Sequence, residues 1–250
     1  MRPCLLATAL LLLASPAVRA DALGDLRANL RKLESGQPVR AQIAVKRIGS
    51  SSDGDDAHQS VQEGTVLAES GPQGLRLTWT PQQIREDRQA DWRKAASPSS
   101  QTERGGGLDL LDAKQAAELL DQAEPLRLAI EGAVLLEDRI EPRNGKPARV
   151  LVLRPRDELT PNERKSLRHR DDVLKIWLDA EGLPTASERT ADLKFSKLLI
   201  SFRVGIHQVQ AFARLGGRLV VTSASEESSG SGLGQSGESR RLVRVTPSAG

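Results

Sequence analysis

The sequence predicts an α+β fold that is mainly antiparallel β: a curled open sheet, or half-barrel, of about eight to ten strands with helices on its concave face. Three observations lead to this prediction. Short segments in which apolar and polar side chains alternate recur along the chain, as in half-buried strands. Turn residues separate them at intervals too short for the crossovers that parallel strands need. Leucines at helical spacing form apolar stripes that need a sheet face to cover, and a sheet this wide tends to curl.

Residues 1–20 have the features of a secretory signal peptide. Arg2 gives the positive start, residues 5–14 form a short apolar run, and small side chains lead to a cleavage point before Asp21. A run of about ten apolar residues is half the length needed to span a bilayer, roughly 20, and no later stretch is longer. We therefore expect a periplasmic protein, cleaved after Ala20, with no transmembrane segment.

The composition of the exported chain argues against several further classes of protein. The only cysteine, Cys4, precedes the apolar run and leaves with the signal, so we expect neither a disulfide framework nor a lipid anchor at the cleavage site. The full chain has 36 basic and 33 acidic residues, and the loss of Arg2 and Arg19 reduces the basic excess from three to one. Because both signs are interspersed, a nucleic-acid partner is not expected.

One basic cluster stands out between Arg164 and Arg170, flanked by Glu163 and the pair Asp171-Asp172. A cluster of mixed sign is typical of the solvated end of a helix, which is the structure that we expect here. A site for an anionic partner is the alternative interpretation of the same residues.

The first third of the mature chain predicts a helix followed by a three-stranded meander. Four leucines between Leu23 and Leu33 recur at spacings of three and four, which places them on one face of a helix. Residues 39–48 then alternate with a period of two, as in a half-buried strand. Further strands near 59–69 and 75–79 follow across turns rich in Gly, Ser, Asp and Pro.

The middle of the chain changes in character. Residues 81–107 are polar and charged, and we expect a mobile insertion with a marginal helix around Trp92. Its last part, residues 97–107, has the Ser- and Gly-rich composition of a flexible segment. A stronger helix is predicted over residues 109–121 and is expected to end at Pro125.

The second half of the chain predicts consecutive hairpins. The Asn144-Gly145 pair is the strongest short hairpin signal in the sequence and separates strands at 133–141 and 148–153. Two further hairpins are expected over residues 173–193 and 199–222. Such a series favours one antiparallel sheet.

Smaller features complete the predicted organisation. Residues 160–163 predict the start of a short helix, with Thr160 as the cap and Glu163 completing a capping box. An edge strand is expected at 240–245, and residues 247–250 are expected to form a loose end. The prediction for the mature chain is one half-barrel domain over residues 21–246 that carries the polar insertion.

The order of elements resembles the LolA/LolB-like superfamily of periplasmic lipoprotein carriers and acceptors, and the envelope-stress regulators that share their open half-barrel. The resemblance lies in the stripe Leu23-x2-Leu26-x3-Leu30-x2-Leu33 leading into Val39-Arg40-Ala41-Gln42-Ile43-Ala44-Val45. Residues 174–184, LKIWLDAEGLP, add an apolar strand that ends in Asp, a Gly turn and Pro. The resemblance implies a half-barrel with helices plugging its concave face, and a function in binding or sensing a lipid or a lipidated protein.

The sequence offers no catalytic or metal-binding constellation, so we expect a protein without enzymatic activity, cofactor or metal. His58, His169 and His207 lie in separate segments without partner ligands at metal spacing. The acidic turn at 53–56 lacks the terminal glutamate of a calcium loop and is expected to be hydrated. The chain also contains neither a G-x-S-x-G nor an S-x-x-K motif.

Apolar residues of the predicted strands are the candidate ligand-binding set. In a half-barrel the core and a ligand cavity share the same face, so each of these residues has a core role as its alternative. Trp79 and Trp177 are the preferred members, because amphipathic rings suit the rim of a cavity. The full set is Leu75, Leu77, Trp79, Ile176, Trp177, Phe202 and Val204.

Two functions follow from this reading. The first is a binding protein that shelters an acyl chain, a lipidated protein or an apolar peptide in its cavity. The second is an interaction, assembly or sensing module of the cell envelope. Its cavity would be filled by its own helices, and it would bind another envelope protein by strand addition or through residues 81–107. Peripheral contact with membranes is compatible with both.

The first testable expectation concerns processing. The chain expressed with its leader should yield a periplasmic protein whose intact mass corresponds to residues 21–250, because the apolar run and the small residues before Asp21 fit signal-peptidase cleavage. Mass spectrometry measures this directly. Retention of residues 1–20, or a lipid on Cys4, would contradict it.

Overall fold

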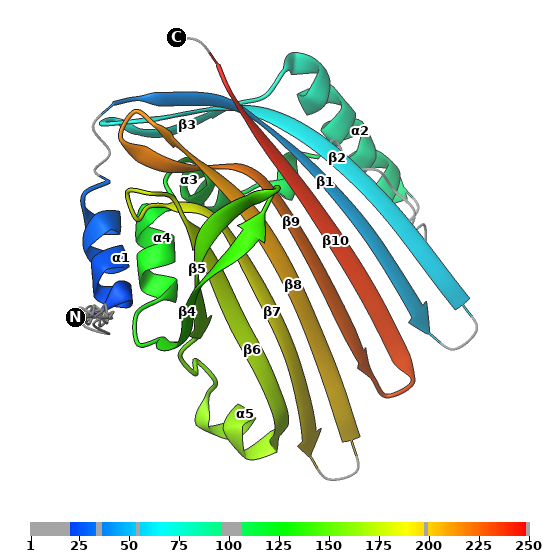
Figure 1. Ribbon diagram of the computed structural model, residues 1–250. Coiled ribbons are helices and arrows are strands. Elements are labelled where there is room, and N and C mark those ends of the chain that lie inside the picture. The colour runs from blue at the N-terminus through cyan, green and yellow to red at the C-terminus, as the bar shows by residue number, and fades with distance from the viewer. Residues whose placement is uncertain (1–20, 34–36, 54–55, 97–106, 198–199, 249–250) are drawn as a thin grey trace, which may run out of the picture.

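A computed structural model describes most of residues 21–248 as one open sheet with helices (Figure 1). Residues 1–20, predicted as a signal peptide, the segment 97–106 and the last two residues lie outside the described residues. The described ranges are 21–33, 37–53, 56–96, 107–197 and 200–248.

Ten strands form the sheet, and every neighbouring pair is antiparallel. Their order is β3-β2-β1-β10-β9-β8-β7-β6-β5-β4. The strands are β1 (Val39–Asp53), β2 (Asp56–Gly71), β3 (Gly74–Thr78), β4 (Val134–Arg143), β5 (Lys146–Arg154), β6 (Leu167–Leu178), β7 (Pro184–Lys197), β8 (Ile200–Leu215), β9 (Arg218–Gly232) and β10 (Gln235–Pro247). The predicted antiparallel, mainly β fold class is confirmed.

Short turns make the hairpins, as the sequence predicts. Asn144 and Gly145 both have positive φ, 50° and 75°, as a two-residue turn between β4 and β5 requires. The expected edge strand at 240–245 is wrong. These residues belong to β10, which pairs with β1 on one side and β9 on the other, so the edges of the sheet are β3 and β4.

The helices lie at different parts of the sheet (Figure 1). Among the described residues they are α1 (Ala22–Arg31), α2 (Pro81–Ala96), the 3-10 helix η1 (Leu108–Leu110), α3 (Ala113–Leu120), α4 (Ala123–Ala129) and α5 (Pro161–Ser166). The predicted capping box of α5 is present, with Thr160 and Glu163 each bonding the other's backbone N–H.

The region predicted as one helix over 109–121 is instead divided into η1, α3 and a further helix, α4. Asp112 caps α3 and bonds the backbone N–H of Gln115. Pro125 does not end a helix but lies in the first turn of α4, where its missing N–H removes no intrahelical bond. The sequence prediction therefore missed α4.

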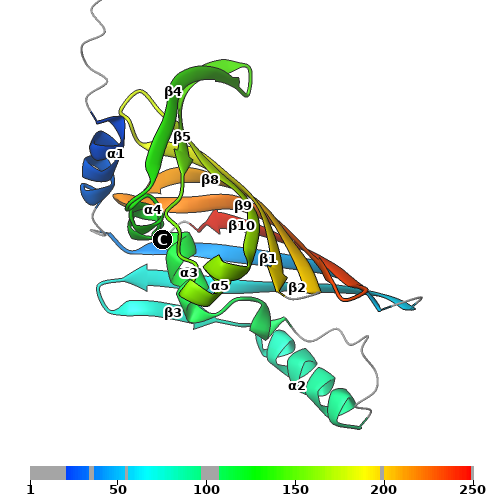
Figure 2. The same ribbon diagram turned by 90° about the horizontal axis from the view of Figure 1, so that it is seen from below.

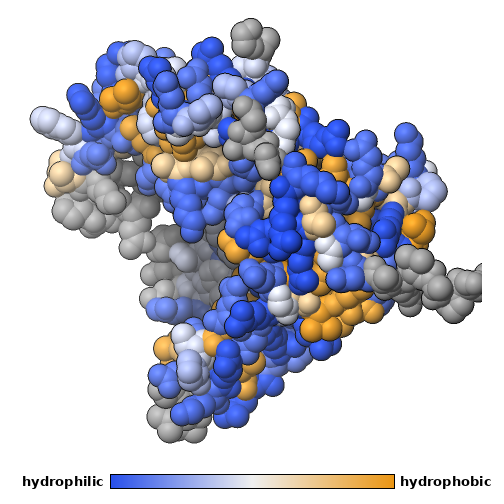
Figure 3. All heavy atoms as spheres, turned by 90° about the vertical axis from the view of Figure 1, so that its left-hand side faces the viewer, coloured by the Kyte–Doolittle hydropathy of each residue, from blue (hydrophilic) through white to orange (hydrophobic). Residues whose placement is uncertain are grey.

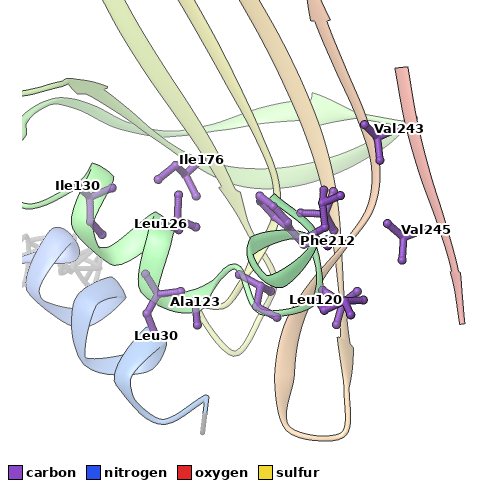
Figure 4. Close-up of a cluster of buried hydrophobic side chains, with 14 of the residues drawn as sticks. Leu30, Leu120, Ala123, Leu126, Ile130, Ile176, Phe212, Val243 and Val245 are labelled. Carbon is purple, nitrogen blue, oxygen red and sulfur yellow. The ribbon is translucent and has the colours of Figure 1, made fainter. Parts of the chain in front are cut away.

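The main core lies between the helices and one face of the sheet, which we call the inner face. Figure 4 shows α1, α3 and α4 directing Leu30, Leu120 and Ile130 into this layer, opposite Ile176 and Phe212 of the sheet. The sheet curls around these helices, although the strands extend far beyond them (Figures 1 and 2). Only part of the inner face is therefore covered by helices.

Helix α2 contributes little to this core. It projects away from the sheet (Figure 2), and Ala90 is its only buried apolar residue. A helix around Trp92 is thus confirmed.

None of the helices in the described ranges has the length and apolarity needed to cross a membrane. On the side that faces the viewer in Figure 3, the surface is mostly hydrophilic, with hydrophobic side chains in scattered patches.

Two leucines of the helical layer give a matched test of this packing. Leu120 at the end of α3 is fully buried, whereas Leu128 of α4 is 52% exposed. Leu120→Ala should lower the free energy of unfolding by about 2–5 kcal/mol, because it leaves a cavity between helix and sheet. Leu128→Ala should change it by less than about 0.5 kcal/mol. Urea denaturation of both variants measures the difference, and equal effects would contradict the described core.

Candidate functional site

Beyond the helices, the inner face carries a strip of large apolar side chains. Residues of one strand alternate between the two faces, so Phe202, Val204 and Ile206 of β8 share the inner face. In the register of β7 with β8, Phe195 lies opposite Phe202, and Leu193 lies opposite Val204. We call these five residues the inner strip. Phe202 is 41% exposed and the others are half-buried, although none belongs to the main core cluster.

Small residues border the inner strip on the side of β9 and β10. The inner-face positions next to it on β9 are Ser228, Gly230 and Gly232, which pair with Ile206, Val204 and Phe202. A Cβ atom on Gly232 would lie 2.5 Å from Cδ1 of Phe202, so this ring lies over the glycine. The small residues keep the floor of the inner face low, and at Gly232 the ring of Phe202 takes the space that a side chain would occupy.

An ion-pair cluster separates the inner strip from the helical core. Asp172 of β6 is buried and accepts hydrogen bonds from Arg189 Nε at 3.0 Å and from Arg170 Nη2 at 3.0 Å. Burial acts to raise the pKa of Asp172, but the bonds and charges of Arg189 and Arg170 outweigh it and hold this pKa below its ordinary value.

This cluster corrects part of the expectation of a solvated helix end between Arg164 and Arg170. Arg164 and Lys165 do lie in the exposed last turn of α5. Helix α5 ends at Ser166, and the residues from Leu167 onward form β6. Arg170 also donates to the backbone carbonyls of Pro155 and Arg156, which fixes the loop after β5. The cluster therefore has a structural role. The carboxylate of Asp172 is buried on the inner face, and a buried charge needs partners.

A cavity of about 210 Å³ lies between this region of the sheet and α4. Leu126 and Ala129 line it from the helix, and Arg156 and Glu158 line it from the loop after β5. The sheet contributes mostly polar side chains: Leu174, Ser187, Arg189, Gln208 and Gln210. Gln208 lies on the same face of β8 as Ile206 and Val204, two residues from Ile206, so the polar cavity lies next to the inner strip.

The seven predicted ligand-binding residues lie in three places. Leu75, Leu77 and Trp79, in and just after β3, are partly buried against the main core. Ile176 is fully buried within that core. Phe202 and Val204 belong to the inner strip. The structure thus brings together Phe202 and Val204 but separates them from the other predicted residues.

The seventh residue, Trp177, lies on the opposite, outer face. It is adjacent to Ile176 in β6, and neighbouring residues of a strand point to opposite faces. Its ring is 4% exposed, packs with Val150 and Ala186, and donates a hydrogen bond from Nε1 to Glu141 Oε1 at 2.9 Å. The Arg143 guanidinium lies 4.0 Å from the ring centre. Trp177 therefore supports the β4–β5 hairpin, and the seven residues do not form one site.

A second hollow, of about 530 Å³, lies on the outer face over β2, β1, β10, β9 and β8. It is larger than the inner cavity, and its outer-face lining includes the apolar side chains of Val209 and Leu242. The rest of this lining is short or charged, as at Ala44 and the ion pair of Lys46 with Glu63. No aromatic side chain among the described residues lines this hollow, whereas the inner strip has two.

The histidines remain apart in the structure. His207 Nε2 lies 3.0 Å from Glu188 Oε1, and His169 lies on β6. The side chain of His58 and the predicted mobile part of the insertion lie outside the described residues. In the described ranges there is no group of three or more His, Cys, Asp or Glu side chains placed to hold a metal ion.

Comparison with known proteins gives two similar solved structures. No protein-family model matches the chain. No curated protein matches it either. A LolA superfamily protein from Nitrosomonas europaea is 13% identical, with 89% of this chain and 92% of that chain covered and a TM-score of 0.28. MucB, in its complex with MucA(peri), is 13% identical, with 90% and 93% covered and a TM-score of 0.19.

At 13% identity and these TM-scores, the likeness carries no conclusion about ligand or partner. The function of this chain is therefore inferred from its own residues.

The ion-pair cluster predicts a pH dependence. Asp172→Asn should lower the free energy of unfolding at pH 7 by roughly 1–3 kcal/mol, because charged hydrogen bonds are lost. Since the folded pKa of Asp172 lies below the unfolded value of about 3.8, this loss should shrink as the pH falls below 4 and the wild-type carboxylate is protonated.

The control is Asp171→Asn, which makes the same change one residue away on an exposed side chain. Urea denaturation between pH 7 and pH 2.5 compares the two variants. A loss for Asp172→Asn that stays constant over this range would contradict the role of the carboxylate.

Proposed function

We propose that this chain is a non-enzymatic, periplasmic binding protein that holds an acyl chain or another extended apolar group on the inner strip. One observation carries the proposal: large apolar side chains, two of them aromatic, line an uncovered part of the inner face instead of joining the core. A soluble protein seldom leaves such a surface without a partner. The signal-peptide features of residues 1–20 support the periplasmic address.

The polar cavity beside the inner strip suits the other end of such a ligand. The side-chain amides of Gln208 and Gln210, with the guanidinium of Arg189, offer hydrogen-bond donors within one short, partly enclosed space. An amphipathic ligand would place its apolar chain along Ile206, Val204 and Phe202 and its polar head near these groups. Fatty acids, phospholipids and lipidated peptides share this chemistry.

An interaction or sensing module is the second proposal, and a different observation favours it. Buried residues of α1, α3 and α4 fill the end of the inner face that they cover, which leaves only the polar cavity beside α4. A protein partner that presents an apolar or lipidated segment would occupy only the uncovered part. In both proposals the mature chain forms one half-barrel domain over residues 21–246, with the insertion outside the binding face.

A pair of matched variants tests the first proposal. Val204 lies on the inner strip, and Val61 is 37% exposed at an outer-face position of β2. Val204→Ser should weaken the binding of a fluorescent fatty acid by about tenfold, because the loss of apolar contact and the added hydroxyl together cost roughly 1.4 kcal/mol. Val61→Ser should leave the binding unchanged. Fluorescence titration gives both dissociation constants.

Trp177→Ala extends the test to the outer face. This change should lower the free energy of unfolding by about 3 kcal/mol and leave the affinity of the folded protein for the probe unchanged, because the ring packs beneath the β4–β5 hairpin. No saturable binding to the wild type, or equal losses for Val204→Ser and Val61→Ser, would overturn the acyl-binding proposal and leave the interaction module.

A further inference from the structure

The edge strand β4 exposes an unusual combination of side chains. It is the last strand of the sheet on its side, so in the part of the chain that the structure describes its outer edge has no partner strand. Ile140 in the middle of this edge is 65% exposed, and Val134 and Leu136 are also exposed. An exposed edge with apolar residues is a template for pairing with another strand.

The charged residues of β4 alternate in sign on one face. Glu137, Arg139, Glu141 and Arg143 are two residues apart and therefore share a face. That face is the outer one, because Glu141 bonds Trp177 and Arg143 covers its ring. Arg139 bonds both Glu137 and Glu141 along the strand.

This alternation makes the edge complementary to itself. When two copies of one strand pair antiparallel about a twofold axis, the residue on the axis faces its own copy. With Ile140 on the axis, Arg139 faces Glu141 of the other copy, and Glu137 faces Arg143. Each pair occurs twice by symmetry. All four contacts then join opposite charges, which is the favourable arrangement across a ladder.

Other registers of two paired β4 strands bring like charges together. With Arg139 on the axis, Arg139 faces its own copy and Glu137 faces Glu141. With Glu141 on the axis, Glu141 faces its own copy and Arg139 faces Arg143. Such contacts between like charges destabilise a ladder. With Asp138 on the axis, two aspartates meet. The regular part of the edge favours the same centre, because a bulge between Leu135 and Glu137 ends it on one side and the Asn144-Gly145 turn on the other. The midpoint of Glu137–Arg143 is Ile140.

We propose that β4 pairs antiparallel with β4 of a second copy of this chain, with Ile140 on the twofold axis, so that two sheets join edge to edge. The two Ile140 side chains meet on one face while the opposite charges pair on the other. Pro142 lacks an N–H and removes donors at both ends of the paired segment, so the association is limited in length. This proposal does not depend on a ligand at the inner strip, which lies several strands away.

Cysteine cross-linking tests the register. The mature chain has no cysteine, since Cys4 belongs to the signal peptide. In the proposed pair the two residues at position 140 face each other with Cα atoms about 4.5–5.5 Å apart, within disulfide range. Oxidation of Ile140→Cys at micromolar concentration should therefore give a covalent dimer on a non-reducing gel.

The control is Leu136→Cys, an exposed apolar position of the same strand that would lie far from its own copy. It should stay monomeric under the same oxidation. No dimer from Ile140→Cys, or as much dimer from Leu136→Cys, would overturn the proposal.

Charge exchange gives a second, independent measurement. Arg139→Glu places like charges opposite each other at two symmetric contacts and should raise the dissociation constant of the dimer by about tenfold in sedimentation equilibrium. The double change Arg139→Glu with Glu141→Arg restores opposite charges and should return the constant to near the wild-type value. Circular dichroism confirms folding of each variant. Failure of the double variant to recover, with its fold intact, would contradict the register.

Discussion

The burial of only one end of the inner face is the constraint on which the rest of this structure depends. Three short helices, α1, α3 and α4, cover the sheet where Ile43, Leu151 and Ile176 are fully buried. The ten strands are longer than this helical layer, so their far ends continue without a cover (Figure 1). Hydrophobic burial stabilises the covered end. At the other end the inward positions carry charged and polar residues such as Arg47 and Gln62, small residues, and the apolar side chains of the inner strip.

An ion-pair cluster lies between the covered and the uncovered region of the inner face. Asp172, Arg170 and Arg189 occupy inner-face positions next to the apolar core, where each isolated charge would be costly. Their mutual hydrogen bonds make the arrangement tolerable and tie β6 to β7 and to the loop after β5. The cluster thus fixes the wall of the polar cavity and the beginning of the inner strip. Stability and the proposed binding surface therefore share one set of side chains.

Sequence periodicity was enough to predict the fold class, the hairpins and the alternation of β8 that places Phe202 and Val204 on one face. The same periodicity excludes a site that contains both Ile176 and Trp177, because neighbouring residues of a strand point to opposite faces. Asp172 was detectable too, since it keeps the period of Leu174 and Ile176.

The pairing of β10 with β1 and β9 was not predictable from local pattern, because its Ser- and Gly-rich half is held by hydrogen bonds from distant strands. Helix α4 was not predicted, because Pro125 was taken to end the preceding helix. A proline is in fact tolerated in the first turn of a helix, and Pro125 lies in the first turn of α4.

The proposed function places an acyl-bearing ligand on the far part of the inner face. Native mass spectrometry of the purified protein, before and after the addition of a long-chain fatty acid, tests this placement most directly. We expect a bound species in one-to-one ratio that is lost on denaturation and is reduced by Val204→Ser but not by Val61→Ser. A mass equal to the bare polypeptide in every sample, including those with excess fatty acid, would contradict it.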